Sequence, residues 1–227
     1  MSQGFTPRQS ATRSSLREQI TEALRGAVIT GEMRPGELYS APALAEKFGV
    51  SATPVREAML DLVGEGLMEA VRNKGFRVTE PSEKELDDLT EVRTMLEVPA
   101  CARIAERYEP AWADRVAELR GLADEIVTHA RDRDLIGYIA ADHRFHLTLL
   151  ELAGNAELVS VVGRLRARSR LPGLAGLAEA GHLARSAAEH GELLDLIQAG
   201  DAAGTAALMR RHIAHVRGLW AGRAEGS

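Results

Sequence analysis

Four side chains in the C-terminal part of the chain have the types and spacing of a metal site. Asp142 and His146 are four residues apart, so both project from one face if this segment is a helix. His190 and His212 fall in two later segments of helical pattern, and the facing helices of a bundle can bring such groups together. One carboxylate and three imidazoles suit a divalent ion, and these residue types leave Zn²⁺, Ni²⁺, Mn²⁺ and Fe²⁺ open.

Spacing alone also allows a simpler interpretation of the histidines. Pairs three apart, such as His143 with His146 or His212 with His215, are frequent on exposed helix faces. We therefore interpret His143 and His215 as surface groups, or as groups that contact the ligands without binding the ion.

A second set of polar residues lies near the N-terminus, in a pattern typical of DNA binding. A short helix is expected over 42–48, Gly49 forms the turn, and Ser51, Thr53 and Arg56 begin the next helix. This is helix-turn-helix spacing, in which the second helix enters the major groove by its N-terminal end. The hydroxyls and the guanidinium can bind phosphates and base edges, and Ser51 is expected to cap the helix.

Three cations follow in a predicted β-hairpin. The hairpin pairs residues 67–71 with residues 76–79 around a loop that contains glycine. Arg72, Lys74 and Arg77 lie within six residues, as a wing that touches the DNA backbone or minor groove requires. The alternative is that these are ordinary solvated charges, because residues 1–80 contain 10 basic and 10 acidic side chains.

Composition and periodicity predict the elements that must position these residues. The chain has 227 residues, of which 45% are hydrophobic and only 4% aromatic, a composition that favours packed helices. We expect a flexible tail over 1–13, a winged helix-turn-helix of three helices and a β-hairpin over 14–80, and an antiparallel bundle of six or seven helices over 82–221. The bundle helices are expected near 82–108, 111–131, 134–153, 155–170, 183–199 and 202–221.

The charge balance restricts the kind of partner. The net charge of −5 belongs wholly to residues 81–227, which argues against binding to nucleic acid or membranes through bulk charge. A lone cysteine, Cys101, cannot form an intramolecular disulfide, and we find no signal peptide or membrane-spanning segment. We therefore expect a mainly α-helical cytoplasmic protein with a small, local DNA-binding surface.

The N-terminal motifs resemble the GntR family of bacterial transcription regulators. The resemblance rests on four segments: ITGEMRPGEL at 29–38, LAEKFGVSATPVREA at 44–58, EGL at 65–67 and GFRV at 75–78. It implies a winged helix-turn-helix that binds double-stranded operator DNA. Family members commonly carry arginine where this chain has Ala52 and a charged residue where it has Pro42, so we expect an operator that differs from those of better-matched relatives.

Residues 82–220 resemble the FCD ligand-binding domain of the FadR-type GntR regulators. The matching segments are DHRFHL at 142–147, AGN at 153–155, EH at 189–190, AGD at 199–201, and His212. In that domain the matching aspartate and three histidines commonly hold a divalent metal inside the bundle. The resemblance thus assigns Asp142, His146, His190 and His212 as metal ligands.

The same resemblance suggests how an effector is bound. Residues 91–97 are similar to the first sensor helix of the family, whose matching arginine, here Arg93, often lines the effector cavity. An arginine beside a metal would hold a carboxylate bidentately, which favours a small organic acid, such as a hydroxy or keto acid. The alternative for Arg93 is a surface pair with Glu97 at i+4. Asn155 either reaches the cavity or caps the following helix. Its position directly before that helix favours the cap.

These observations predict a metabolite-responsive transcription regulator that binds a pseudo-palindromic operator as a homodimer. The first alternative is a DNA-binding regulator whose metal is purely structural and which has no effector. The second alternative is a metal-dependent enzyme. Two observations argue against it: no second carboxylate has the spacing of a general base, and an enzyme would leave the winged domain unexplained.

Overall fold

The computed structural model describes residues 15–169 and 182–220, and side chains up to residue 214. The expected tail at 1–13 and the helix break at 171–173 lie outside the described residues. The N-terminal elements, which we call the winged domain, are α1 (Leu16–Thr30), β1 (Leu38–Tyr39), α2 (Ala41–Phe48), α3 (Ala52–Gly64), β2 (Met68–Val71) and β3 (Gly75–Val78). The described bundle consists of α4 (Glu83–Glu106), the 3₁₀-helix η1 (Pro110–Trp112), α5 (Ala113–Asp132), α6 (Leu135–Glu151), α7 (Ala156–Ser169), α9 (His182–Gln198) and α10 (Ala202–Trp220).

Local signals explain where the winged-domain helices begin and end. Ser15 and Glu18 form a capping box at the start of α1, and Gly31 ends it in the left-handed conformation. Gly49 ends α2 in the same way, with φ of 66°. Ser51 is the N-cap residue of α3, the position predicted from the sequence, although its side chain makes no capping hydrogen bond.

The sheet contains a strand that the sequence does not reveal. The strand order of the sheet is β1-β3-β2, and both pairings are antiparallel. Arg77 of the central strand β3 lies opposite Leu38 of β1 on one side and opposite Glu69 of β2 on the other. Strand β1 has two residues, too few for an alternating pattern to show. Gly75, with φ of 119°, lies so close to the backbone carbonyl of Tyr39 that a side chain would collide with it.

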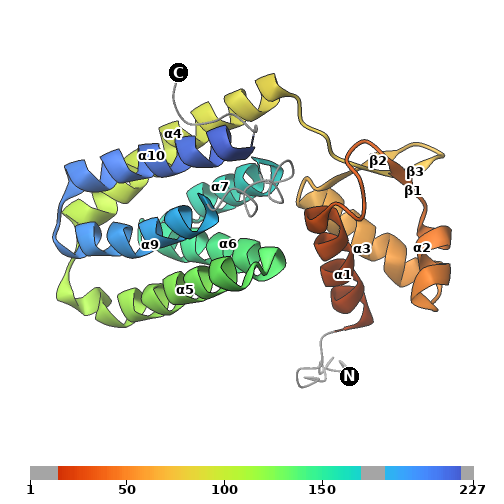
Figure 1. The fold of residues 1–227 in the computed structure, drawn as a ribbon, viewed down its shortest axis with the longest axis horizontal. Helices are drawn as coiled ribbons and strands as arrows, with labels where there is room; N and C mark the ends of the chain where they lie inside the picture. The colour runs from red at the N-terminus through yellow and green to blue at the C-terminus, as the bar shows by residue number, and fades with distance from the viewer. Residues whose placement is uncertain (1–14, 170–181, 221–227) are drawn as a thin grey trace, which may run out of the picture.

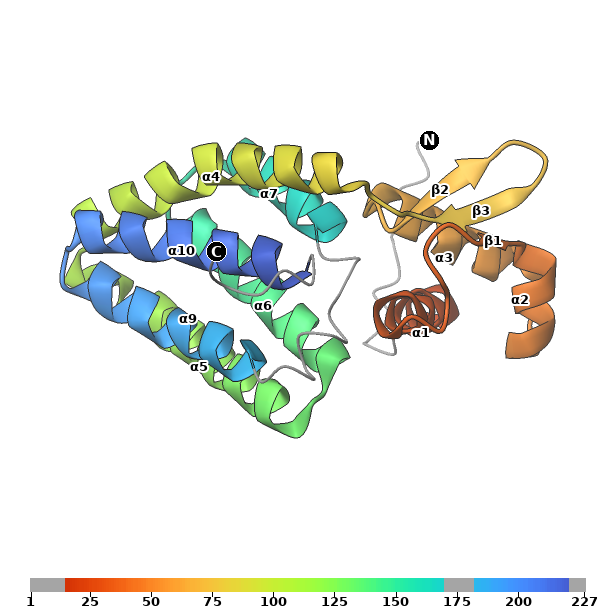
Figure 2. The same ribbon diagram turned by 45° about the horizontal axis from the view of Figure 1, so that its top comes forward.

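The bundle packs its helices as antiparallel neighbours, with α4 against α10 and α5 against both α6 and α9 (Figures 1 and 2). Ser82 and Glu85 form the capping box predicted at the start of α4. The mainly helical fold, with a winged helix-turn-helix ahead of a helical domain, is the one predicted from the sequence. Among the described helices, none combines the length and apolar character that crossing a bilayer requires.

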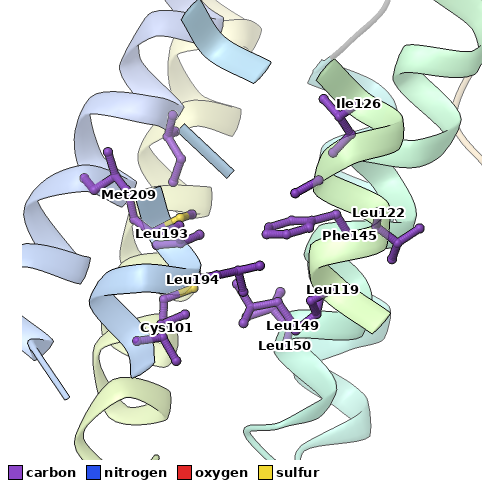
Figure 3. Close-up of a cluster of buried hydrophobic side chains, with 14 of the residues drawn as sticks. Cys101, Leu119, Leu122, Ile126, Phe145, Leu149, Leu150, Leu193, Leu194 and Met209 are labelled. Atoms are coloured by element: carbon purple, nitrogen blue, oxygen red, sulfur yellow. The ribbon is translucent and has the colours of Figure 1, made fainter. Parts of the chain in front are cut away.

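Each part of the chain has its own hydrophobic core. Val55, Met59 and Leu62 of α3 are fully buried at the centre of the winged domain. In the bundle, Phe145 of α6 points into the space between α5 and α9 (Figure 3). Fully buried side chains on several helices fix how these helices pack, and thereby where the polar residues among them lie.

The winged domain and the bundle touch through two glycines. A methyl group at Gly26 of α1 would lie 3.0 Å from Cδ1 of Ile136 on α6. At Gly66, after α3, a methyl group would lie 2.5 Å from Cγ of Arg168 on α7. Helices α6 and α7 of the bundle therefore contact the winged domain, and their ends lie beside it in Figure 1.

Candidate metal centre and nucleic-acid interface

The four predicted ligands meet inside the bundle. Asp142 and His146 of α6, His190 of α9 and His212 of α10 each offer one atom, and these atoms all lie within 4.8 Å of one another. Nε2 of His190 lies 3.2 Å from both Nε2 of His146 and Oδ1 of Asp142. All four residues are buried, with exposed fractions of at most 4%. We call these residues the ligand cluster.

The surroundings of the ligand cluster fit a metal ion. Nδ1 of His212 lies 2.8 Å from Oε2 of Glu189, and Nδ1 of His190 lies 3.1 Å from the carbonyl oxygen of Ala187. Metal-binding histidines characteristically donate their second ring nitrogen to such a carboxylate or carbonyl. Nε2 of His212 is buried with no hydrogen-bond partner among the described residues, as expected of a nitrogen that faces an ion.

Burial also keeps the imidazoles in the form that binds metals. Phe145 packs edge-on against His146 and His190, with ring centroids 5.3 and 4.8 Å apart. Burial, reinforced by the positive charge of Arg166, holds the pKa of His146 well below its usual value. Burial likewise lowers the pKa of His212 to about 4, although the hydrogen bond with Glu189 opposes the shift. Neutral imidazoles have a free lone pair to donate.

A chain of buried ion pairs connects the ligand cluster to α4. Arg166 of α7 donates from Nη2 to Oδ2 of Asp142 at 2.8 Å and from Nη1 to Oε2 of Glu97 at 2.7 Å. Arg93 donates to the other oxygen of Glu97 at 2.7 Å and to the Ser169 hydroxyl at 3.1 Å. Burial raises the pKa of Glu97, but the two guanidiniums outweigh it and lower this pKa to about 2.

These buried ion pairs correct the interpretation of Arg93 as half of a surface pair. The i+4 pair with Glu97 exists, but Arg93 is 1% exposed, so the pair is buried and not on the helix surface. Two donor nitrogens of these arginines, Nη2 of Arg93 and Nε of Arg166, are buried without hydrogen-bond partners among the described residues.

Asn155 is exposed and accepts a hydrogen bond from the amide of Leu158 at 3.1 Å, as a cap of α7 does.

Sequence reasoning missed Arg166. Its signal is weak but present, because Val162, Arg166 and Ser169 occupy positions i, i+4 and i+7 of α7 and are all buried. A basic residue on the apolar stripe of a helix needs a buried partner.

The predicted DNA-reading residues of α3 form an exposed edge at the N-terminal end of this helix. Ser51, Thr53 and Arg56 are exposed in the first turns of α3. The Arg56 guanidinium lies 5.7 Å from the ring centroid of Phe76 on β3, within the range of a cation–π contact. Sequence reasoning did not foresee this contact, because it joins a helix to a strand twenty residues further along the chain.

The wing extends this edge. Arg72 and Lys74 are exposed in the turn between β2 and β3. They line a groove of about 680 Å³ that also includes Arg56. Arg77 is different, because its guanidinium is paired with Glu69 of the neighbouring strand at 2.9 Å. Its charge is therefore less available to a phosphate than the charges of Arg72 and Lys74.

Comparisons with known proteins agree with this architecture. Residues 16–78 match the model of the bacterial regulatory proteins, gntR family, and residues 88–215 match the FCD domain. An uncharacterized HTH-type transcriptional regulator of Agrobacterium vitis, from the TAR-I ttuE-ttuC' intergenic region, is 36% identical over 131 residues, 58% of this chain and 77% of that protein. The HTH-type transcriptional regulator McbR of Escherichia coli K12 is 30% identical over 166 residues, 73% of each chain.

Structural similarity extends over nearly the whole chain. The solved structure of E. coli McbR/YncC has a TM-score of 0.73 and 26% sequence identity, and the match covers 92% of this chain and 99% of that one. The matching families and relatives are transcriptional regulators and not enzymes, in agreement with the prediction from sequence. The chain belongs to the GntR family of bacterial regulatory proteins and carries an FCD domain after its winged helix-turn-helix.

Proposed function

We propose that the protein is a metabolite-responsive FadR-type regulator that acts in the cytoplasm and binds a pseudo-palindromic operator as a homodimer. In this proposal, a small organic acid bound beside a divalent metal in the bundle modulates the affinity for DNA. The observation that carries it is the ligand cluster, with four buried ligand atoms within 4.8 Å of one another and an ion-pair chain attached to one of them.

Asp142, His146, His190 and His212 would hold the ion, and Glu189 would orient His212. When bound, the metal supplies a positive charge and coordination positions for a carboxylate oxygen. Zn²⁺ in a tetrahedral site would use all its positions on the four protein ligands, which is typical of structural zinc. Ions that prefer six ligands, such as Ni²⁺, Mn²⁺ or Fe²⁺, would leave positions for an effector.

The buried charges favour an anionic effector. The charged side chains buried around the ligand cluster are two guanidiniums and three carboxylates, belonging to Arg93, Arg166, Glu97, Asp142 and Glu189. Their formal charge is −1, and it becomes 0 when Arg211 is counted, a half-exposed residue that pairs with Glu189 at 3.2 Å. A divalent cation would make the net charge positive in either case, which an anion offsets. The buried donors of Arg93 and Arg166 that lack partners among the described residues are suited to hydrogen-bond the same group. The side-chain oxygen of Asn155 caps α7, so in this proposal only its amide nitrogen is available to contact an effector.

One helix of the ligand cluster, α6, contacts the winged domain, and so does α7, which carries Arg166. Helix α6 contributes Asp142 to the cluster and Ile136 to the contact with Gly26. Helix α7 contributes Arg166, and two residues later Arg168 packs on Gly66. An effector that binds one arrangement of α6 and α7 more tightly would shift the orientation of the DNA-reading edge.

The exposed face of α4 supports the homodimer. Val92 and Met95 lie one turn apart on this helix and are 42% and 61% exposed. Adjacent apolar side chains on an exposed helix face are typical of surfaces that pair. A two-fold dimer would present two reading helices to the two half-sites of a palindrome.

The rival function is a regulator with a purely structural metal. The closed set of four protein ligands favours it if the ion is Zn²⁺. An apo protein that keeps its fold and its operator affinity, and that ignores organic acids when loaded with metal, would support this rival.

Arg56→Ala should weaken operator binding by about 1 to 3 kcal/mol, because Arg56 is the reading-helix cation that can address a base edge. The measurement is fluorescence anisotropy at fixed salt, with an operator fragment that the wild-type protein has selected from random DNA. Arg131→Ala, on α5 and paired with Asp132, is the matched control and should bind normally. Unchanged affinity of Arg56→Ala would refute this placement of the reading helix.

His190→Ala and His212→Ala should each lose bound metal, because each removes one of four ligands. Elemental analysis of protein purified without an affinity tag measures the metal content. His143→Ala changes a histidine of α6 outside the ligand cluster and should keep the full metal content. Full occupancy in both ligand variants would overturn the metal assignment.

Arg93→Lys should weaken carboxylate binding about tenfold, or 1.4 kcal/mol, since lysine keeps the charge but lacks the planar fork of donors. Calorimetry of metal-loaded protein with a panel of hydroxy and keto acids provides the affinities. Arg103→Lys, on the exposed side of the same helix, is the control. Equal affinities for all three proteins would exclude Arg93 from the effector site.

The double variant Val92→Asp, Met95→Asp should be monomeric, because four charges would face one another across a two-fold interface. Light scattering should give a mass near 24.5 kDa for the variant and twice that for the wild type. Val127→Asp introduces a charge at an exposed apolar residue of α5 and should remain dimeric. A dimeric double variant would place the interface elsewhere.

A further inference from the structure

A cavity of about 530 Å³ lies between the winged domain and the bundle. Its walls come from α1 and the segment after α3 on one side, and from α6 and α7 on the other. None of the four metal ligands lines it. Its volume is in the range of small-molecule sites. The larger apolar lining residues are Ile29, Leu67, Ile136, Ile139, Leu147 and Val159.

One basic side chain of the cavity is not paired with an acid. Arg25 is paired with Glu65, and Arg144 lies 3.4 Å from Glu125. Arg164 instead donates to the hydroxyl of Ser160 at 2.8 Å, and it has no carboxylate partner among the described residues. An arginine next to an apolar cavity, with donors left over, is suited to bind an anion.

We propose that this cavity is a second ligand site, which binds an apolar compound with one negative charge, such as an aromatic carboxylic acid. The hydrocarbon part would lie against the apolar walls, and Arg164 would bind the carboxylate. Charge complementarity supports an anion beside Arg164, because the lining acids Glu22 and Glu65 both pair with Arg25, and Arg144 lies near Glu125.

Such a ligand would contact both parts of the protein at once. Ile29 and Leu67 belong to the winged domain, whereas Ile139 and Val159 belong to the bundle. The affinity for the ligand therefore depends on how the two parts are arranged, and by linkage the ligand changes the affinity for DNA. This route to regulation does not require the metal.

The test compares 2-naphthoate with naphthalene-2-carboxamide, two probes of nearly equal shape that differ in charge. In calorimetry with the full-length protein, we expect the naphthoate to bind at least fivefold more tightly than the carboxamide. Arg164→Gln should remove this difference, since it keeps a polar side chain but no charge. Arg131→Gln, outside the cavity, should preserve it.

A second variant tests the cavity itself. Ala140 is exposed on α6 and lines the cavity, so Ala140→Trp should fill it and abolish binding of both probes without disturbing the core. Circular dichroism checks that each variant is folded. Equal affinity for the two probes in the wild type, or binding that survives both Arg164→Gln and Ala140→Trp, would overturn the proposal.

Removal of metal separates this site from the ligand cluster. Protein treated with EDTA should bind 2-naphthoate within twofold of the metal-loaded affinity, whereas binding of hydroxy and keto acids should be lost. Loss of naphthoate binding on EDTA treatment would show that the probe occupies the metal site and would contradict the proposal. Saturating naphthoate should also change operator affinity at least twofold, and no change would refute the linkage to DNA binding.

Discussion

The packing of the helical bundle depends on one buried guanidinium, that of Arg166. It hydrogen-bonds Asp142 on α6 and Glu97 on α4, and it is itself carried by α7. Charges removed from water are costly unless they are paired with good geometry, and removal of one partner of such a pair costs about 3 to 5 kcal/mol. Three helices can therefore pack closely at this level only in an arrangement that keeps both hydrogen bonds.

The same guanidinium restrains Asp142, the carboxylate of the ligand cluster. Asp142 offers Oδ1 to the ligand cluster while Oδ2 is held by Arg166. If the cluster holds an ion, as proposed, a change in its charge or position would act on Arg166 through Asp142, and on Arg93 through Glu97. The ligand cluster and the first helix of the bundle are thus joined by contacts that are hydrogen-bonded at every step, although Arg93 and Asp142 are 49 residues apart in the chain.

Much of the fold and of the site was predictable because their signals are local. The spacing of Asp142 and His146 places them on one helix face, and Ser82 with Glu85 specifies a helix start; both appear in the structure. Contacts between distant segments were not predictable in this way. Strand β1 exists only because β3 pairs with it, and the partners of Arg166 come from two other helices. Ser51 is at the predicted N-cap position but makes no side-chain capping bond, because residue type indicates a capacity for a hydrogen bond and not whether the side chain makes it.

If Arg56 contacts a base, as proposed, its contact with Phe76 has a consequence for how tightly DNA is bound. A free arginine loses rotational freedom when it docks on a base, at a cost of about 0.5 to 1.5 kcal/mol for a flexible side chain. With its guanidinium already resting on the ring of Phe76, Arg56 has given up part of that freedom before DNA arrives. Because Phe76 belongs to β3, a displacement of the wing would restore the freedom and return the entropic cost to the recognition step.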